Sequence, residues 1–367
     1  MKRLAFAFIT LFSPLAPFSQ LSAQTEIANF IPGVNQDGVN YFLPQTALRI
    51  TIVAEKTVTT PGDLNKYAFR YLRLKDVPAA NTTAWKIKSI SVEPYGVPDP
   101  EKAYNVKVKA KTSAPLVSLT HEGLLLAINA EADEETLPPL PKGTPAPELL
   151  NPKRYMNQEM LSAGSTAKLA ELCAQEIYDV RDSRNALIRG EADNTPKDGA
   201  QLKLMLDQLD TQDKALTQLF CGTTETSTEV FSINYLPEKE TDKALLFRFS
   251  QFSGVVGTDD LSGQPIYISI KNSGTLPPKQ TSQTDATNGK TKKLLSSSKV
   301  KTEKGVFYNV PAQEKIRIFD VNQTLVETTC AMGQFGHTEI LSDALFDKKL
   351  TTKVTFYQGT GSIKKLE

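Results

Sequence analysis

Two amphipathic segments between Ser162 and Gly222 constrain the fold more than any other part of the sequence. In the first segment, apolar side chains recur at helical spacing, at Leu169, Leu172, Cys173, Ile177, Val180, Leu187 and Ile188. The second segment repeats the pattern at Leu202, Met205, Leu206, Leu209, Leu216, Leu219 and Phe220. This spacing puts an apolar stripe along each of two helices. The short connection predicts antiparallel neighbours, and the width of the stripes predicts that the pair also packs on another element.

The ends of both helices carry local signals. Ser165 offers an N-cap for the first helix, and Gly190 and Gly222 supply the two stops. For the second helix we predict Thr195 as the N-cap, Pro196 at the first helical position and Asp198 near the positive end. The helical hairpin is therefore placed at residues 161–222.

Alternating patterns on both sides of the hairpin predict an α+β fold in which two β-rich domains flank it. The first domain is placed at residues 24–135. Its expected elements are a strand at 48–55, a short helix from Thr60-Pro61-Gly62-Asp63 to Leu74, strands around 87–92 and 106–108, and an apolar run at 124–128. Pro94, Gly96, Pro98 and Pro100 are expected to separate the two middle strands.

The second β-rich domain is placed at residues 223–367, and we expect a sandwich or a partly open barrel. Its predicted elements are strands at 230–235, 245–250, 266–270 and 354–357, and a hairpin that turns at Asn322-Gln323. Residues 272–304 hold seven lysines among Ser, Thr and Gln, with Leu294-Leu295 as the main apolar pair. That composition predicts a long mobile loop.

A proline-rich segment at residues 136–160 joins the first domain to the hairpin. Its prolines, together with acidic residues just before it, predict a semi-rigid spacer of polyproline II character. A ligand for a proline-recognition domain is the functional alternative.

Residues 1–23 have the pattern of a secretory signal peptide. Lys2-Arg3 precede an apolar run from Leu4 to Phe12, and Leu21-Ser22-Ala23 suits cleavage. Pro14 and Pro17 interrupt the run well short of the ~20 residues that a transmembrane helix needs. No later segment is long or apolar enough to span a bilayer. We therefore expect an exported protein, in the periplasm or associated with the outer membrane.

Composition and motifs indicate little chemistry. Lys+Arg total 42 against 41 Asp+Glu, so no overall field favours nucleic acid. His121 and His337 have no partner at metal-ligand spacing, and the chain lacks a GxSxG elbow, a phosphate loop and an EF-hand loop. Cys173 and Cys221 would lie at different heights of the hairpin, which favours buried thiols over a bridge. We predict no catalytic, cofactor-binding or metal-binding residue and no cofactor.

Four stretches carry a resemblance to a known family. They are AGSTAKLAELCAQEIYDVRDSRNALIRGEADNTPKDGAQLKLMLDQLD, IPGVNQDGVNYFLPQTALRI, RFSQFSGVVGTDDLSGQPIYI, and QFG followed by TKVTF. Together they resemble an uncharacterised secreted family of Gram-negative bacteria, domain of unknown function 4831. The resemblance implies a cell-envelope protein with no established activity, and it transfers no catalytic residue.

These observations favour a non-enzymatic binding or assembly protein. We expect an envelope protein as partner, or self-association, and no nucleic acid. The alternative is a glycan-binding or small-molecule-binding protein, and after it a hydrolase with an acidic site between the domains.

Overall fold

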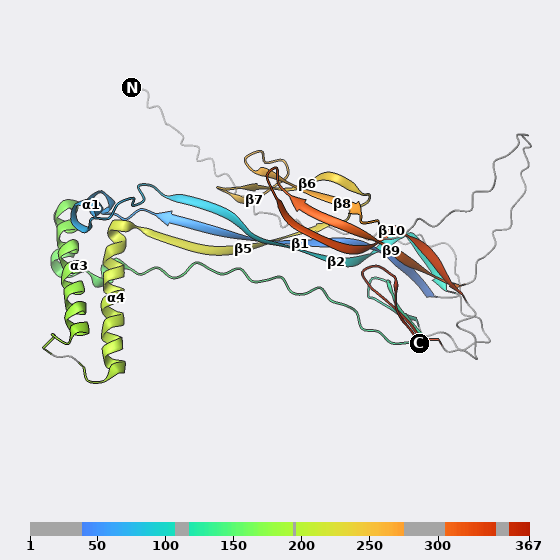
Figure 1. The fold of residues 1–367 in the computed structure, drawn as a ribbon, viewed down its shortest axis with the longest axis horizontal. Coiled ribbons are helices and arrows are strands. Elements are labelled where there is room, and N and C mark those ends of the chain that lie inside the picture. The colour runs from blue at the N-terminus through green and yellow to red at the C-terminus, as the bar shows by residue number, and fades with distance from the viewer. Residues whose placement is uncertain (1–38, 107–116, 194–195, 275–304, 343–351) are drawn as a thin grey trace, which may run out of the picture.

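The computed structural model describes residues 39–106, 117–193, 196–274, 305–342 and 352–367. The predicted signal peptide and residues 275–304 of the predicted lysine-rich loop lie outside these ranges. The described strands form three antiparallel sheets, and a pair of helices stands at one end of an elongated molecule (Figure 1). The fold is therefore β-rich and compatible with the α+β class.

A long three-stranded ribbon forms the axis of the molecule. Its central strand β1 (Val39–Thr60) pairs on one side with β2 (Thr82–Val106) and on the other with β5 (Thr223–Tyr235). We expected separate strands around 87–92 and 106–108, but β2 runs unbroken through Pro94, Pro98 and Pro100. Proline is tolerated there because β2 is an edge strand, where a missing N–H need not break the sheet. Val108 lies outside the described residues.

A five-stranded sheet packs on one face of the ribbon. Its order is β10-β9-β8-β6-β7, and the strands are β6 (Thr241–Ser250), β7 (Gly254–Val256), β8 (Gln264–Asn272), β9 (Gly305–Phe319) and β10 (Thr324–Ser342). Ile50 and Ile52 of the ribbon share a core with Ile268, Ile316 and other apolar side chains of this sheet. The predicted turn at Asn322-Gln323 is confirmed, because it joins β9 to β10.

The third sheet is small and contains the last two described strands of the chain. Its order is β12-β11-β4-β3, formed by β3 (Val117–Leu119), β4 (Leu125–Ile128), β11 (Val354–Phe356) and β12 (Ile363–Leu366). Tyr41 and Leu43 of β1 pack against it. The strand expected at 354–357 is present, whereas β12 was not predicted because its sequence, IKKL, is short and charged.

The layout of two separate β-rich domains is not confirmed. Strands from before and after the hairpin share sheets, since β1 pairs with β5 and β4 pairs with β11. The positions 135 and 223 therefore do not coincide with breaks between the described sheets. Residues 46–52 of β1 are mostly buried on both faces, so the strand requires a neighbour on each edge, and the second neighbour comes from beyond the hairpin.

The helical hairpin is confirmed, with α3 (Thr166–Arg189) and α4 (Gly199–Cys221) side by side. Ser165 caps α3, and Gly190 ends it with φ of 71°. The N-cap of α4 is Asp198 and not Thr195, because the Asp198 carboxylate accepts the Ala200 amide at 3.0 Å. Thr195 itself lies outside the described residues.

The base of the hairpin packs on further elements, as the width of its stripes predicted. These are η1 (Asn65–Tyr67), α1 (Ala68–Leu72), η2 (Pro152–Tyr155) and α2 (Gln158–Leu161). Leu64 and Met160 meet Ile177, Leu216 and Phe220 in one buried cluster. The short helix expected before Leu74 is thus η1 with α1, and the end of the expected linker is helical.

The proline-rich segment lies along the ribbon, on the face away from the five-stranded sheet (Figure 1). Residues 131–151, called the strap below, form neither helix nor strand. The Arg49 guanidinium donates to the Pro138 carbonyl at 2.6 Å, and the Thr228 amide donates to the Thr144 carbonyl at 2.9 Å. Near the hairpin, the Gln218 side chain donates to the Leu150 carbonyl at 2.6 Å. The strap is therefore an extended connection docked on the sheet.

We expect Gly62→Ala to weaken the joint between ribbon and hairpin. A Cβ at Gly62 would overlap the carbonyl oxygen of Leu219 in α4, and this backbone cannot yield cheaply. The substitution should lower the free energy of unfolding by about 1–3 kcal/mol. Thermal unfolding would show this loss as a lower midpoint. Gly164→Ala is the matched control, because nothing lies within 4 Å of its added Cβ. Equal stability of the two variants would contradict the tight joint.

Candidate functional site

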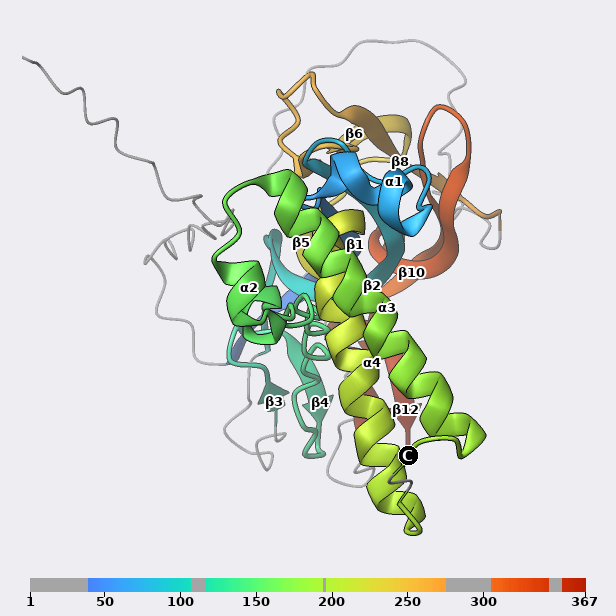
Figure 2. The same cartoon turned by 90° about the vertical axis from the view of Figure 1, so that its left-hand side faces the viewer.

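The distal part of the hairpin projects beyond the cluster that holds its base (Figures 1 and 2). On α3 the buried residues of that cluster end at Ile177, and on α4 they begin at Leu216. Residues 178–189 of α3 therefore reach about 18 Å further, at ~1.5 Å per residue. This distal part, residues 178–189 of α3 with residues 199–215 of α4, is called the arm below.

The arm is held together by its own contacts. Val180 and Leu187 are buried in the seam between the helices. Arg181 binds Asp213 at 3.0 Å and Arg184 binds Asp210 at 2.6 Å. These four side chains are a quarter to two-fifths exposed, so each pair contributes at most about 1 kcal/mol. The arm is therefore a defined structure, and it lies outside the buried core of the rest of the molecule, which is called the body below.

Besides Tyr178, whose hydroxyl donates to the Tyr71 carbonyl at 2.7 Å, three large apolar side chains on the arm face solvent. Ile188, Leu204 and Met205 are 56%, 60% and 38% exposed. The sequence pattern put Ile188 and Met205 on the packed stripes, but the seam is narrower in the arm than at the base. Leu204 was not singled out, because it falls between the helical positions of the stripe. The arm thus presents apolar surface that no described element covers.

A second candidate is a cavity of about 360 Å³ between the start of the strap and the small sheet. It is lined by Leu126, Ala132, Asp133, Glu134, Glu135, Thr355, Phe356 and Lys364. Two of its carboxylates are already engaged: Glu135 pairs with Lys364 at 2.9 Å, and Glu134 accepts the His121 amide at 3.3 Å. The cavity is acidic and draws on residues from both sides of the hairpin.

The residues that could carry metal or nucleophilic chemistry do not converge in the described part of the chain. Its Cys, His, Asp and Glu side chains form no group of three or more that could hold a metal ion. His121 lies in an exposed turn, and the Nε2 of His337 is 3.1 Å from Glu339 Oε1. Cys173, Cys221 and Cys330 are free thiols, and burial raises the pKa of Cys173 and of Cys330 to about 11. At neutral pH these two thiols are therefore protonated and poor nucleophiles.

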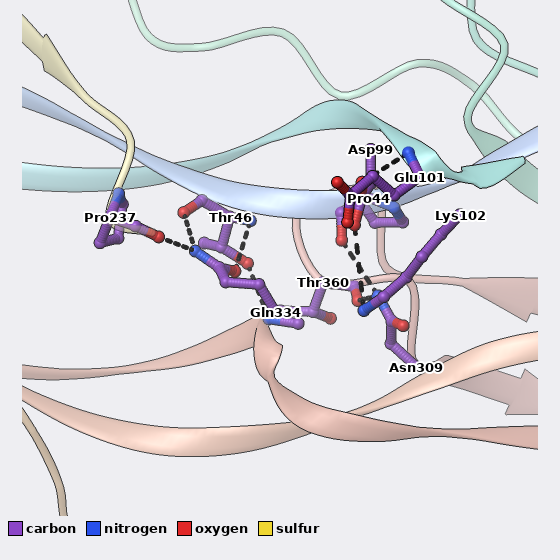
Figure 3. Close-up of polar contacts among 10 residues, drawn as sticks. Pro44, Thr46, Asp99, Glu101, Lys102, Pro237, Asn309, Gln334 and Thr360 are labelled. Atoms are coloured by element: carbon purple, nitrogen blue, oxygen red, sulfur yellow. Dashed lines mark hydrogen bonds and ion pairs between the residues drawn. The ribbon is translucent and has the colours of Figure 1, made fainter. Parts of the chain in front are cut away.

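A buried polar junction ties β1 to β10 and to the C-terminal turn (Figure 3). The Gln334 amide group accepts the N–H of Thr46 at 2.9 Å and donates to the carbonyl of Thr46 at 3.0 Å. The Thr46 hydroxyl donates to the Gly359 carbonyl at 2.8 Å. Two of the stretches that carry the family resemblance, QFG and FLPQTALRI, meet here. The sequence pattern did not reveal this contact, because it joins positions 288 residues apart.

Asn309 completes the junction from β9. Its side-chain amide donates to the carbonyls of Pro44 and Thr360, both at 3.0 Å, and the residue is fully buried. Nearby on β2, the buried Asp99 carboxylate accepts the Glu101 amide at 3.0 Å and faces Lys102 (Figure 3). Because these groups bond mainly to backbone, the junction fixes strands in place and offers no reacting atom.

A family model described as a domain of unknown function (DUF4831) matches residues 37–364. No curated protein sequence and no solved structure matches the chain significantly. In the described residues, no helix combines the length and apolar character needed to cross a membrane.

We expect Asn309→Leu to destabilise the fold by about 2–4 kcal/mol. The substitution leaves the buried carbonyl of Pro44 and the partly buried carbonyl of Thr360 without this donor. Chemical denaturation measures the loss. Asn234→Leu, the same change at an exposed position of β5, is the control and should alter stability by less than ~0.5 kcal/mol. A loss at Asn309 no larger than at Asn234 would show that the junction does not hold these strands.

Proposed function

Because the chain belongs to the DUF4831 family, whose description assigns no activity, we propose a function from the geometry of this molecule. The protein is a non-enzymatic binding or assembly protein of the cell envelope, and the arm is its contact surface. Its partner is a protein, either another envelope protein or a second copy of this chain.

The carrying observation is that the arm leaves the body and returns to nearly the same place. Ile177, the last residue of α3 in the buried cluster, and Leu216, the first of α4, both belong to it. A direct connection between these two positions would therefore need none of the residues of the arm. Ordering a residue costs about 1–2 kcal/mol of backbone entropy, and the arm adds nothing to the body's core to offset it. An arm that is kept despite this cost is best explained by contacts outside the molecule.

The chemistry of the arm suits a protein partner. Its exposed Ile188, Leu204 and Met205 lie beside interhelical ion pairs, which resembles an apolar interface centre with a polar rim. An amphipathic helix surface of this kind buries against a groove or another helix.

The envelope location rests on the N-terminal sequence. Lys2-Arg3, the apolar run to Phe12 and the small residues ending at Ala23 support export. We place the protein in the periplasm or in association with the outer membrane.

Binding of a glycan or small molecule in the acidic cavity is the second candidate. The observation that favours it is the lining by Asp133, Glu134 and Glu135 over an apolar floor of Leu126 and Phe356. Thermal-shift screening of envelope sugars tests this candidate. If a ligand binds, and Glu135→Gln abolishes binding while arm substitutions do not, the result would support ligand binding in the cavity as the function.

We expect Leu204→Glu combined with Met205→Glu to reduce partner binding at least about tenfold, because two interface side chains would become charged. The matched control is Gln251→Glu with Gln264→Glu, which adds the same charge at exposed positions outside the arm. Photo-crosslinking from position 188 of the otherwise wild-type protein in the envelope first identifies the partner. Affinity for that purified partner is then measured by calorimetry, and light scattering gives the molar mass if the partner is a second copy.

The outcome that would overturn the proposal is equal partner affinity for both double variants and the wild type. All three proteins should have the same free energy of unfolding within about 0.5 kcal/mol, because the four positions are exposed. This comparison separates lost binding from lost folding.

A further inference from the structure

Glu314 is a carboxylic acid inside the sandwich. Along β9 the side chains of Ala312, Glu314, Ile316 and Ile318 are buried, and they alternate with exposed Lys315 and Arg317. The buried series faces the ribbon, since Ile316 and Ile318 belong to the core shared with Ile50 and Ile52. Glu314 is 0% exposed, so it continues this apolar row with a titratable group.

Neither carboxyl oxygen of Glu314 has a hydrogen-bond partner among the described residues. The two residues opposite it are Asn272 on β8 and Cys330 on β10. Lys271 and Lys315, on the neighbouring strand positions, are exposed and pair with Asp242 and Glu327. No described cation therefore compensates a negative charge at Glu314.

The connection between β5 and β6, residues 236–240, brings a second carboxylate to this place. The Glu240 side chain accepts the amide of Asn272 at 3.4 Å, and Asn272 is the strand partner of Glu314. Glu238 and Lys239 are the other titratable groups of this connection, and Tyr235, which pairs with Leu48 of the ribbon, precedes it. Glu238, Lys239 and Glu240 are all exposed, and Glu240 is the one whose charge acts on Glu314.

Burial first, and the charge of Glu240 second, raise the pKa of Glu314 to about 7. The ordinary value is 4.5. Between these values the folded carboxyl holds a proton that the same group loses when it is exposed to water. Stability linked to Glu314 is therefore full below about pH 4.5, falls as the pH rises toward 7, and stays low above it.

We propose that Glu314 is a proton-operated latch: the neutral group lets the 236–240 connection stay seated beside Asn272, and the ionised group releases it. The neutral form has an O–H donor and no charge, so it tolerates the adjacent Glu240 carboxylate. Loss of the proton to water leaves two carboxylates facing each other next to apolar side chains. The repulsion is relieved when residues 236–240 lift and water reaches Glu314, a movement that breaks the 3.2 Å hydrogen bond from the Gln334 side chain to the Pro237 carbonyl (Figure 3). The latch is separate from the arm, because the connection follows Tyr235, which pairs with Leu48 near the middle of β1, whereas the arm stands beyond the end of β1 at Thr60 (Figure 1).

Hydrogen exchange read by mass spectrometry tests the latch in the full-length protein. Peptides that cover residues 236–243 are followed at about pH 5.5 and about pH 8.5, and intrinsic exchange is corrected for. In the wild type the opening equilibrium should increase on the order of thirtyfold between the two values, as the two pKa values above require. Glu314→Gln should remove this dependence, because its amide does not titrate.

Two further variants keep the test decisive. Glu240→Gln removes the facing charge, so the midpoint of the response should move to lower pH, and this variant serves if Glu314→Gln fails to fold. Glu327→Gln, an exposed carboxylate on the same sheet, should keep the wild-type response. Infrared difference spectra should show a protonated carboxyl near pH ~6 that is missing in Glu314→Gln.

The proposal is overturned if the wild type shows no pH response in this segment, or if Glu314→Gln keeps the wild-type response. It is also overturned if the wild type has no protonated carboxyl near pH ~6 beyond that of Glu314→Gln.

Discussion

The three sheets depend on β1, because this one strand lacks a solvent-facing side for much of its length. Leu48, Ile50 and Ile52 face the five-stranded sheet, while Ala47 and Thr51 on the opposite face are also buried. A strand buried on both faces can satisfy its backbone only through neighbours on both edges. β2 supplies one edge and β5 the other. The hairpin must therefore begin and end near the same end of the ribbon, since the chain has to return along β1.

The strap follows from the same constraint. With the five-stranded sheet on one face, the opposite face of β1 still needs a cover, and the strap lies along it. Its prolines carry no N–H, so an extended chain of this composition leaves few donors unsatisfied while it crosses the sheet. The bonds from Arg49 and Thr228 hold it by its backbone, which makes the contact insensitive to most of its side chains. The segment has the composition of a spacer, but its position on the sheet makes it part of the fold.

Local signals in the sequence were enough to predict the elements whose contacts are local. The seam positions of α3 and α4, the Ser165 cap, the Gly190 stop and the turn at Asn322-Gln323 all depend on neighbours a few residues away. The pairing of β1 with β5 joins positions more than 160 residues apart, and nothing in either strand marks its partner. The same holds for Thr46 with Gln334. Glu314 was missed for another reason: in sequence it is one charged residue in an alternating strand, and only the register shows that it faces inward.

The joint between α4 and β5 gives the arm a fixed direction. Only Gly222 separates the last helical residue from the first strand residue, and its φ of 75° turns the chain within one residue. Thr223 pairs at once with Thr60 of β1, and the Leu64 amide donates to the Leu219 carbonyl at 2.8 Å. A helix joined to a sheet in this way cannot swing without breaking strand pairs. The arm therefore presents its apolar side chains at a set position relative to the ribbon, and a partner bound there would be oriented with respect to the whole elongated body.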